Sequence, residues 1–119
     1  MAYTVTIFKA SGEIKTTTQN AKPTYNQIKE AVGGYIETIP YFRSYNGFVR
    51  GVAFAHEEGL IRGFEYNRNA SEAWLKALAG QTGVDPSRVH LVGDVIFFAK
   101  VPERKTIATA DKSPRETRR

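Results

Sequence analysis

The residues best suited to chemistry are aromatic rings and arginines that alternate between positions 41 and 50. The set comprises Tyr41, Phe42, Arg43, Tyr45, Phe48 and Arg50. Aromatic faces stack on bases, at about 1–3 kcal/mol per base, and arginine contributes cation–π contacts. Tyr and Arg also dominate the hot spots of protein interfaces. Since alternate members must face the core, three interpretations stay open: core packing, a protein interface or a nucleic-acid surface. The candidate binding residues are Tyr41, Arg43, Tyr45, Phe48 and Arg50.

Residue types that bind metals or act as nucleophiles are scarce. The only histidines are His56 and His90, neither spaced for a shared metal, and the chain has no cysteine. No phosphate-binding glycine loop, nucleophile elbow or zinc-protease motif is present. The pair Gly33-Gly34 opens a strand, so no helix N-terminus stands behind its amides to bind phosphate. The sequence therefore predicts a protein without enzymatic activity, metal or cofactor.

One pattern loosely resembles a metal-dependent nuclease site. Asp94 is followed by Glu103-Arg104-Lys105, and such a site needs carboxylates for Mg²⁺ and a lysine near the attacked phosphate. Glu103 and Lys105 follow Pro102 into a segment with no periodic pattern, where nothing would hold them to the tolerance that catalysis requires. The favoured interpretation is a turn aspartate and solvated tail charges.

Composition predicts one domain followed by a basic tail. The 119 residues carry a net charge of +5, of which residues 102–119 supply +3 (six basic, three acidic) and residues 1–101 only +2 (eleven basic, nine acidic). Residues 1–101 are therefore expected to form a single compact domain, and residues 102–119 a disordered terminus. No signal peptide is recognised, and the longest apolar run is far shorter than the ~20 residues that span a bilayer. The expected location is the cytoplasm.

The stretch from residue 24 to residue 42 indicates a helix followed by a strand. Thr24 and Gln27 form a capping box, and apolar residues then recur at helical spacing until Gly33. The following strand contains Pro40, which cannot donate to a sheet ladder, so the strand is expected to lie at a sheet edge or to be near its end there.

The flanking segments complete an α+β pattern. Residues 3–9 and 13–18 indicate a hairpin, and Asn46-Gly47 is a strong hairpin signal within a three-stranded meander over residues 35–66. A second helix is expected to start at Asn69 or Ser71 and to stop at Gly80, before a central, wholly apolar strand within residues 89–101. The predicted fold is an antiparallel sheet of five to six strands with two helices packed on one face.

Four short motifs in order resemble an uncharacterised family of small proteins from phages, prophages and plasmids. They are Gly33-Gly34-Tyr35-Ile36-Glu37, Glu57-Glu58-Gly59, Asn67-Arg68-Asn69-Ala70 and Gly93-Asp94-Val95. The resemblance covers roughly residues 3 to 101. Phe64-Glu65-Tyr66 replaces the Leu-Pro that often precedes the family asparagine, and the basic tail is additional. The resemblance implies a mobile-element origin, no known activity, and a role in fold or binding at Gly33, Gly34, Tyr35, Glu37, Glu58, Asn67 and Asp94.

Together these observations favour a non-enzymatic phage or mobile-element accessory protein. It would act by stoichiometric binding of a host protein or a nucleic acid in the host bacterial cytoplasm, without a membrane partner. The alternatives are a sponge that binds a nucleotide immune signal between subunits and, least favoured, a metal-dependent nuclease. An exposed sheet edge near Pro40 would allow a homodimer.

Overall fold

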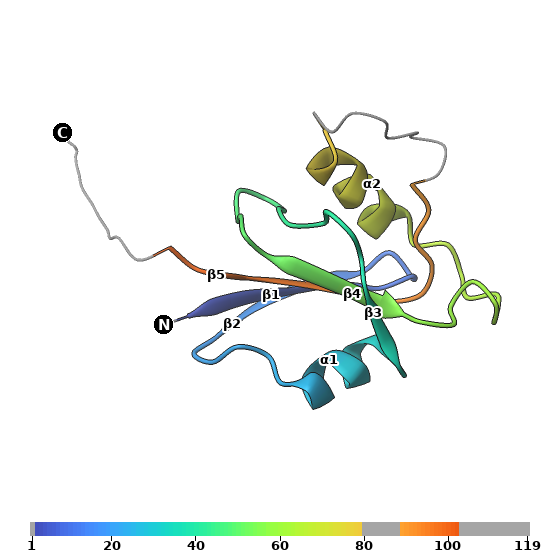
Figure 1. The fold of residues 1–119 in the computed structure, drawn as a ribbon, viewed down its shortest axis with the longest axis horizontal. Coiled ribbons are helices and arrows are strands. Elements are labelled where there is room, and N and C mark those ends of the chain that lie inside the picture. Colours follow the sequence, from blue (N-terminus) through green and yellow to red (C-terminus); the bar gives the residue numbers. More distant parts are fainter. Residues whose placement is uncertain (1, 80–88, 103–119) are drawn as a thin grey trace.

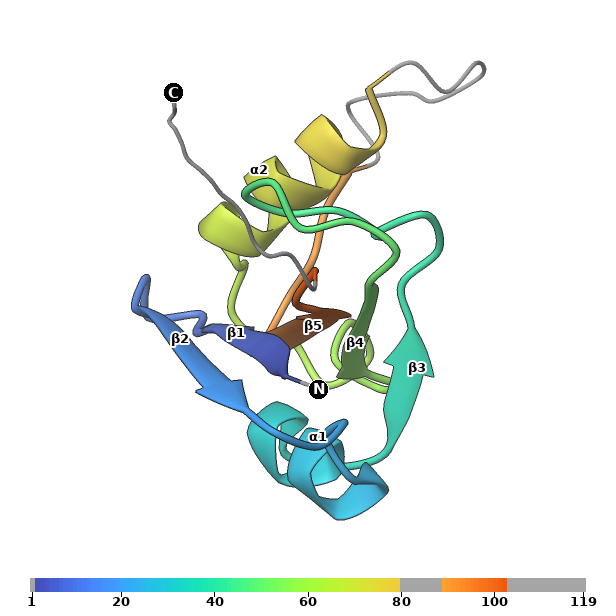
Figure 2. The same ribbon diagram turned by 90° about the vertical axis from the view of Figure 1, so that its left-hand side faces the viewer.

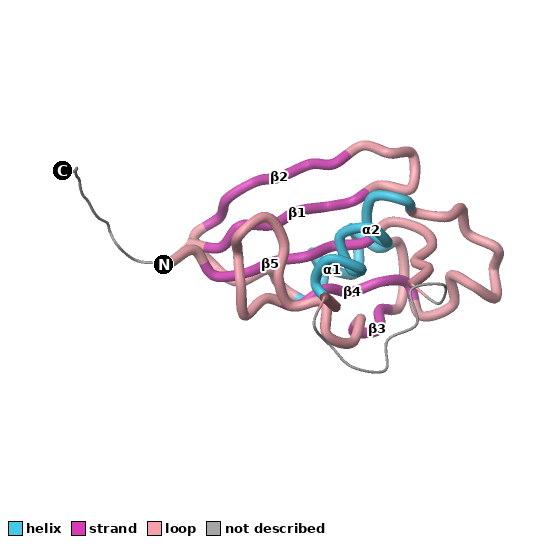
Figure 3. Tube along the Cα trace, turned by 90° about the horizontal axis from the view of Figure 1, so that it is seen from above, coloured by secondary structure: helices cyan, strands magenta, loops and turns pink. Residues whose placement is uncertain are grey.

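The computed structural model describes residues 2–79 and 89–102. In chain order its elements are β1 (Tyr3–Phe8), β2 (Ile14–Gln19), α1 (Tyr25–Val32), β3 (Ile36–Thr38), β4 (Val52–His56), α2 (Arg68–Ala77) and β5 (Val95–Lys100). The strands form one antiparallel sheet in the order β2-β1-β5-β4-β3, which Figure 3 shows from above. The predicted α+β class and five-stranded sheet are confirmed. The expected Gly80 helix stop and disordered tail lie outside the described residues.

The two helices lie on opposite faces of the sheet, which corrects the prediction that both pack on one face (Figures 1 and 2). On the α1 face, Ile28 and Val32 join a core cluster with Phe98. On the α2 face, Ala70 and Ala73 join a separate cluster that includes Phe8, Phe42 and Phe97. The physical reason is β5, whose residues 95–99 are all buried and therefore need an apolar cover on each side.

Helix α1 forms as the sequence predicts. Thr24 Oγ1 accepts a hydrogen bond from the Gln27 amide at 3.1 Å, and Gln27 Oε1 accepts one from the Thr24 amide at 2.9 Å, which completes the capping box. Gly33 ends the helix in the left-handed conformation, with φ of 93°. The short strand β3 follows the helix and ends before Pro40. It lies at the edge of the sheet, a position that tolerates a nearby proline.

Helix α2 begins earlier than predicted. Its N-cap is Asn67, whose side chain accepts a hydrogen bond from the Ala70 amide at 3.0 Å. The two residues expected to cap it have other partners: Asn69 donates to the Gly12 carbonyl, and the Ser71 hydroxyl accepts from the Leu91 amide. The prediction favoured Asn69 because Glu72 stands three residues later, but Glu72 instead pairs with Arg68.

The predicted three-stranded meander is a two-stranded hairpin. Asn46 and Gly47 form the expected turn, both with positive φ, but the strands that they were expected to join shorten to β3 and β4. Residues 39–51 become a long loop over the α2 face. The expected strand at residues 60–66 is a pair of turns, and its one ladder contact is an isolated bridge between Tyr66 and Val92.

Candidate functional site

The five residues proposed as a binding surface do not form one patch. All lie in the loop of residues 39–51, but they divide into two groups. Tyr45 and Phe48 pack against the core, and the Tyr45 ring meets the Phe8 ring edge-on with centroids 4.9 Å apart. Tyr41, Arg43 and Arg50 are exposed. Two of the three aromatic candidates therefore have a structural role, and the arginines remain available to a partner.

Arg43 and Arg50 both line a cleft of about 720 Å³ where β4 begins and β5 ends. Its remaining lining residues are Tyr3, Lys22, Val49, Gly51, Val52, Phe98, Ala99, Lys100, Val101 and Pro102. Four of the lining side chains are cationic, and no Asp or Glu of the described residues is among them. A concave surface lined by one sign of charge concentrates ions of the opposite sign. We call this surface the basic cleft.

Sheet pairing assembles the basic cleft from distant parts of the sequence. In the antiparallel register of β1 and β5, Tyr3 stands beside Lys100. The loop returns to the same place because the Gly51 amide donates to the Arg43 carbonyl at 2.8 Å. Gly51 also lies so close to the core that a Cβ there would fall 2.5 Å from Phe97 Cζ. The absence of a side chain at position 51 thus lets the arginine loop approach the sheet.

The loop holds two bulky residues in an unfavourable backbone conformation. Tyr41 has φ of 61° and Arg50 has φ of 58°, a left-handed conformation that costs a non-glycine residue roughly 1–2 kcal/mol. Such strain persists only where the surrounding structure imposes it, and it is frequent at binding sites. Glycine would relieve the strain at position 50.

The positions singled out by the phage-family resemblance have mostly structural contacts. Asn67 is fully buried, and its Nδ2 donates to the carbonyls of Phe8 and Gly93, each at 2.8 Å. Asp94 Oδ1 accepts from the Ala10 amide at 2.9 Å. A Cβ at Gly34 would fall 2.4 Å from His56 Nε2, and Gly33 ends α1.

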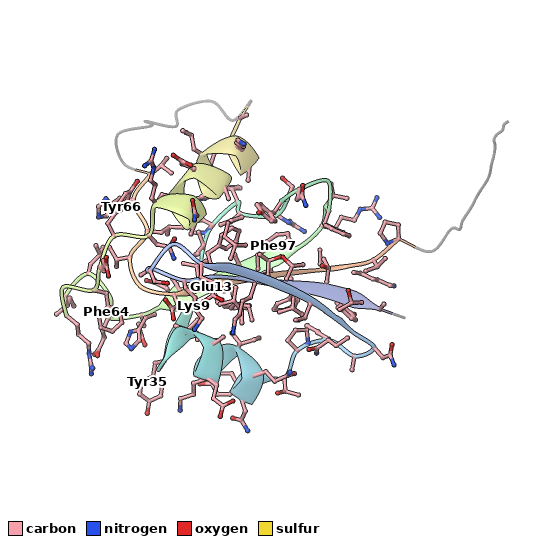
Figure 4. All side chains as sticks on the ribbon, turned by 180° about the vertical axis from the view of Figure 1, so that it is seen from behind. Lys9, Glu13, Tyr35, Phe64, Tyr66 and Phe97 are labelled. Carbon is pink, nitrogen blue, oxygen red and sulfur yellow. The ribbon has the colours of Figure 1, made fainter. Side chains whose placement is uncertain are left out.

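The other three positions that carry the resemblance, Tyr35, Glu37 and Glu58, are exposed. The Tyr35 ring lies under the Lys29 ammonium, which is 4.7 Å from the ring centroid, and the ring points away from the body of the protein (Figure 4). Glu58 pairs with Arg62 at 3.0 Å. Glu37 has no ionic partner within residues 2–79 and 89–102. The side chains of these three residues are therefore on the surface.

The described residues contain no cluster of side chains that could hold a metal ion. No group of three or more His, Asp or Glu side chains gathers there to hold a metal ion. His56 is buried at the end of β4, where its Nδ1 accepts from the Glu58 amide at 3.0 Å. Asp94 precedes β5 and Pro102 follows it, so the two lie at opposite ends of that strand. Glu103 and Lys105 of the nuclease-like pattern lie outside the described residues.

Arg43 and Arg50 were predicted from the sequence as binding residues, whereas Tyr3, Lys22 and Lys100 of the cleft were not. Lys22 lies in a loop with no periodic pattern. Lys100 ends an apolar strand, and the pairing of β1 with β5 is what brings it beside Tyr3. Lys100, a positive side chain directly after the apolar residues 95–99, was the sequence feature that could have indicated the cleft.

Comparison of the chain with protein-family models, with curated proteins and with solved structures finds no match in any of the three. Neither helix of the described ranges is long and apolar enough to cross a membrane.

Proposed function

We propose that this protein acts stoichiometrically, by binding single-stranded nucleic acid in the basic cleft. The observation that carries the proposal is the set of four cationic side chains without a described carboxylate among them. Phosphates neutralised by Lys and Arg release counterions, which supplies most of the affinity of such complexes. Consistent with the resemblance to phage and plasmid proteins, we place this activity in an accessory protein that works in the host bacterial cytoplasm.

A single strand fits the basic cleft better than a duplex. The cleft combines charge with apolar surface, because the exposed Val49 and the half-buried Tyr3, which packs on the α1-face core, lie among the cationic side chains. Unpaired bases offer apolar faces to such a surface, whereas the bases of a duplex are already stacked on one another. A protein partner would have to supply a strongly acidic segment to satisfy the same four cations.

Fluorescence anisotropy with a labelled thymidine oligonucleotide of about 12 nucleotides tests the proposal. We expect saturable binding. The logarithm of the association constant should fall linearly with the logarithm of the salt concentration, with a slope of roughly −3 for four neutralised phosphates. The double variant Arg43→Gln/Arg50→Gln should lose about tenfold or more in affinity and about half of the slope.

The matched control is Arg62→Gln/Arg68→Gln, which removes the same charge from arginines that do not line the cleft. It should bind nearly as tightly as the wild type. Equal losses in the two double variants would show that net charge alone drives binding, and no binding to the oligonucleotide at about 50 mM salt would refute the proposal.

A second candidate follows from the size of the cleft. A volume of about 720 Å³ lies within the roughly 300–1,000 Å³ of small-molecule sites, so a nucleotide signal is the alternative ligand. A cyclic dinucleotide that competes with the oligonucleotide at lower concentration, and that raises the unfolding temperature, would favour this sponge function over strand binding.

A further inference from the structure

A second and smaller hollow lies at the other ends of the same central strands. It measures about 210 Å³ and lies where β4 ends, beside α2 and the segment that leads into β5. Its lining residues are Glu37, Thr38, Ile39, Pro40, Ala55, His56, Glu57, Leu60, Trp74, His90, Leu91 and Val92. This volume falls below the roughly 300–1,000 Å³ of small-molecule and cofactor sites, so a single side chain suits it better than a cofactor. We call it the acidic hollow.

The charges of the acidic hollow are opposite to those of the basic cleft. Glu37 and Glu57 line it, and no Lys or Arg of the described residues does. Glu37 stands opposite Ala55 in the register of β3 and β4, so its side chain leaves the sheet on the α2 face. The two described ion pairs engage Glu58 and Glu72 instead. Within residues 2–79 and 89–102, therefore, both carboxylates of the hollow lack a cationic partner.

The aromatic walls of the hollow are held in place before any ligand arrives. Trp74 Nε1 donates to the Pro40 carbonyl at 2.8 Å, which fixes the indole ring and uses its one polar atom. His90 stacks on Tyr66, with ring centroids 4.7 Å apart. A preformed wall lowers the entropic cost of binding, and the face of an indole ring attracts a cation.

The rim of the hollow is unusually apolar for a surface. Leu60 lines it and is 71% exposed, and the neighbouring Ile61 is 88% exposed. Tyr66, which stacks on the lining residue His90, is also exposed, and Figure 4 shows it away from the end where β5 stops. Clustered exposed apolar side chains mark sites of protein interaction.

We propose that the acidic hollow binds an arginine side chain of a partner protein, with apolar neighbours of that arginine resting on Leu60 and Ile61. A guanidinium group is complementary to both the aromatic walls and the carboxylates of the hollow. It is planar and stacks on an aromatic wall, and its fork of N–H donors pairs with carboxylates such as Glu37 and Glu57. The volume admits one such side chain, and Leu60 and Ile61 supply apolar contacts for the apolar residues next to that arginine.

The chain contains a single tryptophan, so the Trp74 indole N–H gives one reporter signal in the hollow by NMR. The probe is N-acetyl-Leu-Arg-Leu-amide, compared with the same peptide carrying the neutral isostere citrulline, on the full chain. The arginine peptide should shift the indole signal saturably, and the citrulline peptide should bind about tenfold more weakly. The double variant Glu37→Gln/Glu57→Gln should abolish the preference.

Glu58→Gln/Glu72→Gln is the control, because it changes the charge equally outside the hollow. It should keep the preference for arginine. Equal binding of both peptides, wild-type behaviour of Glu37→Gln/Glu57→Gln, or no saturable shift of the indole signal would each overturn the proposal. The inference does not depend on the basic cleft, so a failure to bind the oligonucleotide leaves this result unaffected.

Discussion

The basic cleft and the acidic hollow occupy opposite ends of β4 and β5 and differ in charge and size. The basic cleft is large, is lined by four cationic side chains and takes its arginines from a strained loop. The acidic hollow is small, carries two carboxylates and has walls fixed by hydrogen bonding and stacking. A large surface with several cations suits a polyanion, whereas a small hollow with two carboxylates suits one cationic side chain. Both proposed binding activities together would make the protein a bridge between a nucleic acid and a protein.

The largest expected effect concerns the residue that supports the hollow end of the molecule. Asn67→Ala removes the α2 cap and leaves the buried carbonyls of Phe8 and Gly93 without their donor. We expect unfolding to become easier by about 3–5 kcal/mol, measured by urea denaturation. Asn69→Ala is the matched control, because its one side-chain bond to the Gly12 carbonyl is exposed. Similar losses of unfolding free energy in the two variants would contradict the role of Asn67 as the α2 cap and as the donor to both carbonyls.

A smaller effect separates the glycines beside the two sites. At Gly51 a Cβ would lie 2.7 Å from the Phe98 carbonyl oxygen, whereas at Gly59 the nearest atom would be Val92 Cγ2 at 3.0 Å. Backbone cannot rotate away but a valine methyl can. Gly51→Ala should therefore cost about 1–3 kcal/mol and Gly59→Ala less, by thermal unfolding. The reverse order would show that the loop approaches the sheet differently.

Relief of backbone strain should separate stability from binding at the basic cleft. Arg50→Gly removes a left-handed non-glycine residue and should raise the unfolding free energy by about 1 kcal/mol, while it lowers oligonucleotide affinity. Arg43→Gly removes the same charge at a position without positive φ, so it should lower affinity and give no gain in stability. Urea denaturation measures the stability of both variants, and fluorescence anisotropy measures their affinity for the oligonucleotide. Stabilisation of both variants would contradict the role of strain at Arg50.

The smallest effect is expected at the turn that carries Leu60 and Ile61. Glu58 and Arg62 pair at 3.0 Å, with both side chains about half exposed or more. Exposed pairs contribute little, so Glu58→Gln should change the unfolding free energy by less than about 0.5 kcal/mol. A larger loss by urea denaturation would mean that the pair organises the rim of the acidic hollow.

Local patterns predicted much of the fold, and long-range pairing decided what they missed. The capping box at Thr24, the stop at Gly33 and the central apolar strand could be predicted because neighbouring residues determine them. The start of α2 could not, because Asn67 caps the helix through a side chain that also bonds to distant carbonyls. The strand expected over residues 60–66 failed because Gly63 turns the chain with φ of 70°.

The candidate sites were less predictable than the fold. Arg43 and Arg50 were found because they are close in sequence, whereas Lys22 and Lys100 meet them only through the sheet. The acidic hollow joins Glu37 to Trp74 and His90, and no spacing in the sequence connects such residues. Alternation along the arginine loop also could not show which aromatic rings turn inward, as Tyr45 and Phe48 do.

The most direct test of two independent sites is one ¹⁵N NMR titration of the full chain, first with the thymidine oligonucleotide and then with the arginine peptide. We predict that the oligonucleotide shifts amides of residues 43, 49–52 and 98–101, and that the peptide shifts residues 37 and 57 and the Trp74 indole. Both sets should persist together when both ligands are bound. Overlapping sets, or displacement of one ligand by the other, would contradict the account.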